Sequence, residues 1–257
     1  MKAEVRRQKA EVRRQKAEGR RAFTLVELLV VVAIIGLLVG ILVPVVQKAF
    51  LQAEEAKTKS RIMAIHDACI QYQNDTGYYP GQQYIAHVGQ YDLPNLVWTG
   101  SQYLAKCLCP NLTEVQDPLK PPPPVYLASS REEVTTIKTD TGVPLPDSIS
   151  DRASEPLAIL YYPARLGVTF WLQAGESSPD QPYDRADNLQ YMPGHINDAD
   201  NNWTKWRTFM TDARPDARPV PPGAVTGRPL NLGRFVLVAA GQDREYQSTD
   251  DIVFPPK

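Results

Sequence analysis

The apolar run over residues 23–46 constrains this chain more than any other feature of its sequence. About 20 consecutive apolar residues span the hydrocarbon core of a bilayer as a helix. Glu27 is the single charged residue of the run. Holding a carboxylate in hydrocarbon costs about 2.5 to 3.5 kcal/mol on insertion scales, so such a residue is a functional candidate by default. The sequence therefore predicts a membrane-spanning helix whose carboxylate needs a neutralising partner.

Charge is distributed unevenly along the 257 residues, although the net charge is only -1. Residues 1–22 contain nine Lys or Arg and three Glu, so this leader carries +6 and the remainder -7. A basic flank stays cytoplasmic under the positive-inside rule, which sends the C-terminal bulk across the membrane. The leader repeats the same seven residues at 2–8 and 9–15, with too few apolar positions for a coiled coil. We interpret it as a solvated extension that is discarded.

An ordinary secretory signal is the main alternative for this N-terminus. Such a signal places a small-x-small cleavage site after its apolar run. The residues that follow the run read Gln-Lys-Ala-Phe-Leu-Gln-Ala-Glu-Glu and contain no convincing site of this kind. We therefore expect the apolar run to stay on the mature chain.

Residues 19–44, with paired arginines followed by Phe-Thr-Leu-Val-Glu and the apolar run, strongly resemble the prepilin signal of type IV pilins and type II secretion pseudopilins. The resemblance implies that a membrane peptidase cuts between Ala22 and Phe23 and then methylates the new amine. It also implies that Glu27, the fifth residue after the cut, pairs with that amine on a neighbouring subunit. Such pairing turns two costly charges into one neutral contact. The family usually has Gly before the cut, where this chain has Ala22.

Helical periodicity continues well beyond the apolar run. No turn cluster interrupts residues 45–74, and Gly77 can take the left-handed conformation that ends a helix. A helix over residues 24–75 would be about 78 Å long, with Pro44 bending it or opening one backbone bond. Its second half is predicted to be amphipathic. The charged side holds Glu54, Glu55, Lys57, Lys59 and Arg61, and the apolar stripe holds Ile62, Ile65, Cys69 and Tyr72.

The end of this helix carries a second resemblance. Residues 72–80 read Tyr-Gln-Asn-Asp-Thr-Gly-Tyr-Tyr-Pro. They look like the segment that closes the long helix in major pseudopilins. This match is independent of the N-terminal signal and favours a pseudopilin.

Beyond Pro80, short apolar segments bounded by Pro or Gly predict strands at residues 125–128, 157–162, 168–172 and 234–239. The Pro-rich segments 118–124 and 212–229 cannot supply central strands. We therefore expect an α+β, pilin-like fold, with a long helix packed on a small antiparallel sheet. The expected parts are a leader at 1–22, a membrane half at 23–46, an amphipathic half at 47–77 and a globular domain at 78–257.

Three carboxylates, Asp243, Asp250 and Asp251, are predicted to share one loop after the last strand. Calcium prefers clustered carboxylate and carbonyl oxygens. The segment resembles the calcium-binding C-terminal loop of major pseudopilins, which implies calcium ligation with Asp250 and Asp251 as the best matched ligands. Arg244 and Glu245 stand where glycines are common in that family. The alternative is a solvated acidic turn.

The remaining motifs predict no further site. Residues 197–202 invite a second calcium interpretation, but Trp203 stands where an EF-hand needs glycine. The histidines are scattered and no hydrolase or nucleotide-binding pattern occurs, so we expect no enzyme. The mildly acidic remainder gives no reason to expect nucleic-acid binding. Cys69, Cys107 and Cys109 leave two possibilities open, one disulfide or unpaired buried thiols.

These features predict a structural subunit of a type II secretion pseudopilus. It would be a single-pass inner-membrane protein with its C-terminal domain in the periplasm. Its implied partners are further copies of itself, the prepilin peptidase, the inner-membrane assembly platform and minor pseudopilins. Two alternatives stay open: a type IV pilin or minor pilin for adhesion or DNA uptake, and a monomeric membrane-anchored binding domain.

Overall fold

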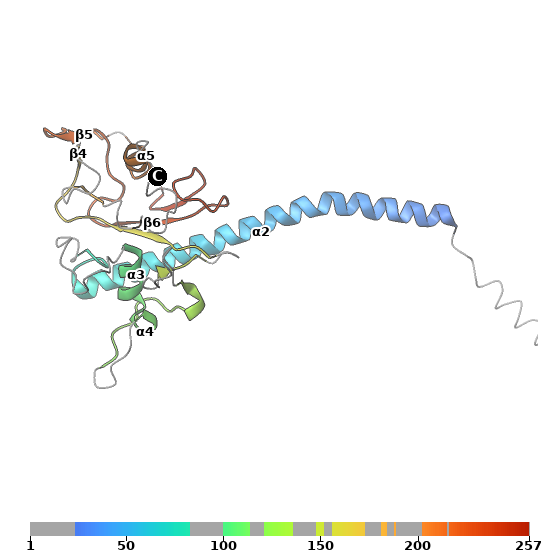
Figure 1. The fold of residues 1–257 in the computed structure, drawn as a ribbon, viewed down its shortest axis with the longest axis horizontal. Helices are drawn as coiled ribbons and strands as arrows, with labels where there is room; N and C mark the ends of the chain where they lie inside the picture. The colour runs from blue at the N-terminus through green and yellow to red at the C-terminus, as the bar shows by residue number, and fades with distance from the viewer. Residues whose placement is uncertain are drawn as a thin grey trace, which may run out of the picture. The chain divides into compact units, whose positions relative to one another are not determined.

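The computed structural model describes residues 24–82, 100–113, 121–135, 148–151, 156–172, 181–183, 188, 202–214 and 216–256. The chain divides into two compact units, Met1–Phe50 and Leu51–Lys257. The described part of the first unit is helical, and the second is a globular unit (Figure 1). In chain order the described elements are α2 (Leu25–Thr76), α3 (Gly100–Leu108), α4 (Pro110–Thr113), η2 (Arg131–Glu133), β1 (Val134–Thr135), β2 (Ser148–Ile149), β3 (Leu160–Pro163), β4 (Trp171–Leu172), α5 (Asn202–Phe209), β5 (Ala224–Val225), β6 (Phe235–Ala239) and β7 (Ile252–Phe254).

The long helix predicted from the sequence is α2, which has 52 residues. It ends where expected, because Gly77 adopts a φ of 86° and its amide donates to the Gln73 carbonyl at 2.8 Å. The predicted bounds, 24 and 75, differ from the observed ones by one residue at each end. The helix continues through Pro44, whose missing N–H leaves one carbonyl without its usual partner.

The apolar stripe in the second half of α2 packs into the globular unit as predicted. Ile62, Ile65 and Cys69 are at most 1% exposed, and Tyr72 packs partly buried against the same core. The prediction that Arg61 lies on a solvated charged side is wrong. Arg61 is 2% exposed, its Nη2 donates to Ser129 Oγ at 2.7 Å, and it lies 3.3 Å from the Glu133 carboxylate. One helical turn separates Arg61 from Ile65, so the guanidinium shares the buried face and takes its partners there.

The central sheet is antiparallel with the order β3-β6-β7. All five residues of β6 are buried, since both faces of the sheet are covered. Phe235 and Leu237 point into a core that includes the stripe of α2 and the buried residues of α3. Val236 and Val238 point into a second core on the other face. This explains why β6 is a continuous apolar run rather than an alternating one.

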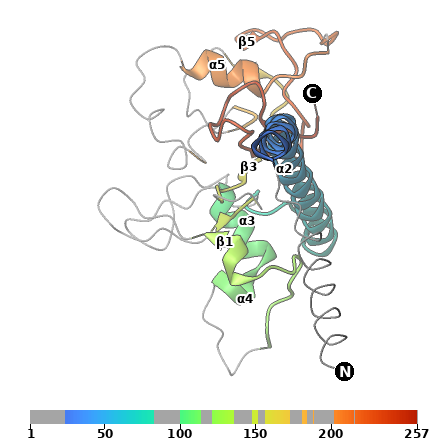
Figure 2. The same cartoon turned by 90° about the vertical axis from the view of Figure 1, so that its right-hand side faces the viewer.

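Aromatic residues dominate the second core. Trp206 of α5 lies edge-on to both Trp171 of β4 and Tyr162 of β3, with ring centroids 5.6 and 5.8 Å apart. Figure 2 shows α3, α4 and β1 gathered on one side of the globular unit and α5 and β5 on the other. All three of these aromatic side chains are at most 1% exposed. The architecture is an α+β, pilin-like fold, a long N-terminal helix followed by small antiparallel sheets.

Three strand predictions need correction. Residues 125–128 are not a strand. Instead the amides of Tyr126 and Leu127 both donate to the Leu108 carbonyl at 3.1 Å, and so cap the end of α3. Residues 157–162 were predicted as one strand, but β3 begins at Leu160 and Ala158 makes an isolated bridge with Ser150. The predicted strand 168–172 is reduced to β4, whereas 234–239 is confirmed as β6.

Candidate functional site

The N-terminus of α2 is a reciprocal capping box built from Thr24 and Glu27. The Glu27 amide donates to Thr24 Oγ1 at 3.2 Å. In return Glu27 Oε2 accepts from the Thr24 amide and the Thr24 hydroxyl, both at 2.9 Å. The Thr-x-x-Glu spacing of a capping box is visible in the sequence, and it gives Glu27 a role at the helix start beside its charge.

The capping box gives Glu27 two separable properties. A glutamine at this position could still accept the Thr24 hydrogen bonds, because capping needs an oxygen acceptor and not a charge. Pairing with a cationic amine needs the carboxylate. Ala22 and Phe23, the residues at the predicted cut, lie outside the described residues.

The apolar side chains described in the first unit make no core. The large ones from Leu25 to Val46 are between 39% and 78% exposed. By length and composition α2 contains one segment that could cross a membrane, and this segment is unburied in the single chain. An exposed apolar surface of this extent marks a membrane or protein interaction site. The helix therefore fits a membrane anchor.

The structure brings Asp243, Asp250 and Asp251 together in the C-terminal loop, with one carboxylate oxygen from each within 4.8 Å of the others. Asp250 Oδ2 accepts from the amides of Gln242 and Asp243 at 2.6 and 3.2 Å. Asp251 Oδ2 accepts from the Gln247 amide at 2.7 Å. Each of these two carboxylates is thus fixed by the loop backbone.

The hydroxyl of Ser248 donates to Asp250 Oδ1 at 2.5 Å and lies 3.2 Å from Asp251 Oδ1. This bond, followed by the two backbone amides, lowers the pKa of Asp250. Burial raises the pKa of Asp251 to about 6. The loop therefore holds a carboxylate whose negative charge is poorly solvated. A bound cation would stabilise this charge.

Two conformational features hold the loop in shape. A Cβ on Gly241 would lie 2.4 Å from Asp250 Cγ, so only glycine allows this approach. Arg244, which stands where the resembling family commonly has glycine, adopts the left-handed conformation at a φ of 61°. Its guanidinium donates to Asp151 Oδ2 at 2.7 Å, and Asp151 is 3% exposed. This part-buried ion pair holds Arg244 in a conformation that glycine reaches without cost.

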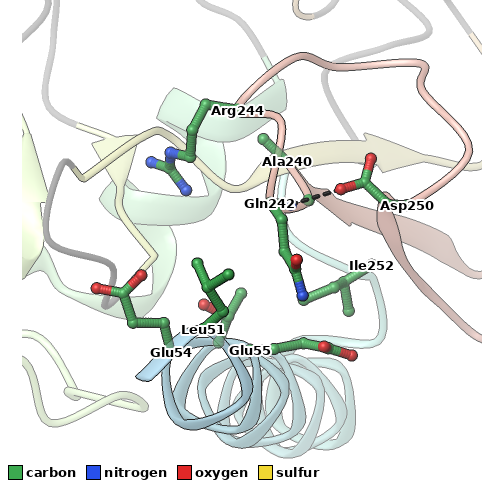
Figure 3. Close-up of a pocket in the computed structure, with 10 residues that line it drawn as sticks. Leu51, Glu54, Glu55, Ala240, Gln242, Arg244, Asp250 and Ile252 are labelled. Carbon is green, nitrogen blue, oxygen red and sulfur yellow. Dashed lines mark hydrogen bonds between the residues drawn. The ribbon is translucent and has the colours of Figure 1, made fainter. Parts of the chain in front are cut away.

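A pocket of about 230 Å³ lies beside this loop within the globular unit. Figure 3 shows Leu51, Glu54 and Glu55 of α2 on one wall, facing Gln242 and Asp250 of the loop. The described lining combines apolar and acidic side chains with Arg244 and the hydroxyl of Thr58. Among the described residues, the aspartates of the loop are the one group of three or more acidic, His or Cys side chains arranged to hold a metal.

The other sequence motifs contribute no site to the described structure. His66 lies on α2 and packs against Phe254, with ring centroids 4.8 Å apart. His87, His195 and residues 197–201 lie outside the described residues. No disulfide joins Cys69, Cys107 and Cys109.

Comparison with known proteins points to the N-terminal segment. Residues 19–43 match the family described as the prokaryotic N-terminal methylation motif. No curated protein and no solved structure matches the chain. The motif indicates a type IV pilin-like substrate of prepilin peptidase, and such a motif belongs to structural subunits rather than to enzymes.

Proposed function

We propose that this chain is a structural subunit of a type II secretion pseudopilus, cut between Ala22 and Phe23 and assembled through α2 to support protein export. One observation carries the proposal. Glu27 is the single charge in an exposed apolar helix that lies within the matched methylation motif and continues into the packing helix of a globular unit. The Tyr-Tyr-Pro segment after α2 favours a pseudopilus over a pilus.

Assembly must cover the apolar half of α2. In the bilayer, lipid covers it, and in a filament the equivalent helices of other copies cover it. Transfer between these settings is nearly neutral in hydrophobic terms, because both are dry. Specific contacts therefore decide whether a subunit joins the filament.

The charge pair supplies such a contact. Cleavage exposes a cationic amine on Phe23, four residues before Glu27. Within one chain Glu27 already accepts the hydrogen bonds of Thr24. The amine of a neighbouring copy then neutralises the remaining charge, so neither ion stays unpaired in an apolar surrounding.

Topology and partners follow from the same features. The basic leader holds the N-terminus in the cytoplasm, and the globular unit lies in the periplasm as the domain of a single-pass inner-membrane protein. The partners are other copies of the chain, prepilin peptidase, the inner-membrane assembly platform and minor pseudopilins. Direction comes from an external assembly motor.

The proposal is tested by Glu27→Val, with Leu28→Val as the matched control in the same helical turn. Glu27→Val should insert into the membrane normally, because it removes a charge from an apolar helix, and should fail to assemble. Sheared filaments and the membrane fraction are quantified in the native host. Filament yields equal to wild type would favour the monomeric membrane-anchored domain instead.

Processing has its own test. The intact mass of the purified membrane form should correspond to the loss of residues 1–22 and the gain of one methyl group. A mass that retains the leader would contradict cleavage at Ala22. Deletion of the gene should abolish export of type II substrates, and loss of surface pili with intact export would favour the type IV pilin alternative.

We also propose that the loop over residues 241–251 binds calcium through Asp243, Asp250 and Asp251. The three carboxylates supply the oxygen donors that calcium prefers. Their close spacing concentrates negative charge, which a cation would neutralise. A ligand that binds the folded state alone stabilises it. Calcium, but not magnesium, should raise the Tm of the wild-type protein and not that of Asp251→Asn. An unchanged wild-type Tm would rule the site out.

A further inference from the structure

Two of the three cysteines lie where the end of α3 meets the end of α2. Cys69 is on the buried stripe of α2 and is 0% exposed. Cys107 is in the last turn of α3 and is half-buried. Leu104 and Leu108 of α3 belong to the same core as Cys69.

Hydrogen bonds and ring contacts fix this meeting point. Leu108, the residue after Cys107, accepts the amides of Tyr126 and Leu127 through its carbonyl at 3.1 Å. The Tyr126 ring lies edge-on to the ring of Tyr72, with centroids 5.3 Å apart. Tyr72 is one helical turn after Cys69, so these contacts hold the end of α3 against the turn of α2 that carries Cys69.

The electrostatics agree with this geometry. The pKa of the Cys69 thiol is raised first by burial and then by the charge of Cys107. The pKa of Tyr126 is raised first by burial, then by Asp75, and also by the charge of Cys107. Cys107 therefore acts on Cys69 of α2 and on Tyr126, whose ring contacts Tyr72 of α2.

Cys109 is directed elsewhere. Its Sγ lies 3.5 Å from the Leu127 carbonyl and 3.6 Å from Ser129 Oγ. Ser129 in turn binds Arg61, which precedes Cys69 by two helical turns, or about 12 Å along the axis. The Cys109 sulfur thus contacts the segment that binds Arg61.

We propose that Cys69 and Cys107 form a disulfide that fastens α3 to the end of α2 once the globular unit enters an oxidising compartment. The compartment, but not the pairing, rests on the proposed function. Disulfides persist in the bacterial periplasm and are rare in the cytosol. The bond would close the loop from residue 69 to residue 107, and a loop of this length confers a large share of the stabilisation that cross-links provide.

The oxidation is a thiol–disulfide exchange. The half-buried Cys107 thiolate attacks a protein or small-molecule disulfide, forms a mixed disulfide and releases one thiolate. The Cys69 thiolate then attacks the Cys107 sulfur and releases the second. Two electrons and two protons pass from the cysteines to the oxidant, which ends as a dithiol. Burial keeps Cys69 protonated in the folded domain, so the exchange takes place as the domain folds.

The test uses full-length protein purified from membranes. In one arm it is unfolded, refolded with oxidised glutathione, alkylated and mapped by peptide mass spectrometry. A peptide cross-linked between Cys69 and Cys107 is expected in the wild type and in Cys109→Ser, and not in Cys107→Ser. On reduction, the Tm of wild type and Cys109→Ser should fall by roughly 5 to 15 °C, while Cys107→Ser is unaffected.

Either of two results would overturn the pairing: three unlinked thiols after refolding with oxidant, or a cross-link that uses Cys109. In a second arm, cells are treated with an alkylating reagent before lysis. A Cys69–Cys107 bond in vitro combined with reduced thiols in cells would contradict the periplasmic location while leaving the pairing itself supported.

Discussion

The two halves of α2 differ in how far they expose the same kind of side chain. Ile35 in the first half is 54% exposed, whereas Ile65 in the second half is 0% exposed. The charged side chains of the two halves also differ, in where their hydrogen-bond partners lie. Among the described residues, Glu27 receives hydrogen bonds only from Thr24 in its own helical turn, while Arg61 takes partners from the segment at residues 129–133.

This difference in burial shows which half of α2 completes its packing within a single chain. The second half completes its packing within the globular unit, so its substitutions should change folding stability. The first half has no core of its own, so its substitutions should change membrane insertion or assembly and leave the globular unit intact. Matched pairs of variants can test this division.

The largest stability effect is expected from the isoleucine pair. Ile65→Ala leaves a cavity in the core shared by α2, α3 and the sheet, and should lower the free energy of unfolding by about 4 kcal/mol. Ile35→Ala should change it by less than about 0.5 kcal/mol. Chemical unfolding in detergent, followed by tryptophan fluorescence of the globular unit, measures both. Equal effects would contradict the division.

A glycine pair should give the next largest effect. A Cβ on Gly100 would lie 2.1 Å from the Tyr161 carbonyl oxygen, which belongs to β3. Gly100→Ala should therefore cost about 3 kcal/mol, the upper range for overpacking. A Cβ on Gly36 would have no atom within 4 Å, so Gly36→Ala should leave the Tm of the globular unit unchanged. The measurement is the Tm of both variants. A Gly100→Ala variant with the wild-type Tm would mean that α3 and β3 are not packed so closely.

Ion pairs on the second half provide a smaller contrast. Arg61→Met leaves Glu133 without its buried partner and should cost about 2 kcal/mol, since the glutamate side chain keeps 20% exposure. Lys59→Met breaks an exposed pair with Glu55, 2.6 Å apart, and should cost about 0.3 kcal/mol. Unfolding at low and at high salt should separate them, because only the exposed pair is screened. A salt-insensitive Lys59→Met effect would argue against this ranking.

The smallest expected effect on stability concerns two carboxylates of the globular unit, each paired with an arginine two residues later. The side chains of Arg214 and Arg218 hydrogen-bond Asp212 and Asp216, and lower the pKa of each carboxyl from 3.8 to about 2. Because the folded-state pKa is the lower one, this stabilisation is present above about pH 4 and is lost as pH falls through 2. Replacing both aspartates by asparagine should flatten the acid limb of the stability profile between these values. An unchanged acid limb would show that the pairs contribute nothing.

Much of the long helix could be predicted from sequence, because its signals are local. The apolar run, the stripe at three- and four-residue spacing and the terminal glycine each act within a few turns. The strand at 234–239 was also predictable, since a short apolar run bounded by Gly marks a doubly covered strand. Clustering of the three aspartates followed from their place in one short loop.

What could not be predicted depends on distant contacts. Residues 125–128 have strand-like composition, but their amides cap α3 instead. Arg61 looked solvated because its partners Ser129 and Glu133 lie about 70 residues away. The capping role of Glu27 depends on Thr24, three residues earlier, so the sequence was sufficient to predict it. The prediction made from the charge of Glu27 covered only its role in assembly.

Comparing the assembly of Glu27→Gln with that of Thr24→Ala separates the charge of Glu27 from its role as a helix cap. Glu27→Gln keeps an acceptor for the Thr24 hydrogen bonds and removes the charge, whereas Thr24→Ala removes the hydroxyl cap, worth about 1 kcal/mol, and keeps the charge. We expect both variants to insert into the membrane, Glu27→Gln to form few or no filaments and Thr24→Ala to form them. Wild-type filament yields from Glu27→Gln together with impaired assembly of Thr24→Ala would show that Glu27 serves as a helix cap and not as the partner of a neighbouring amine.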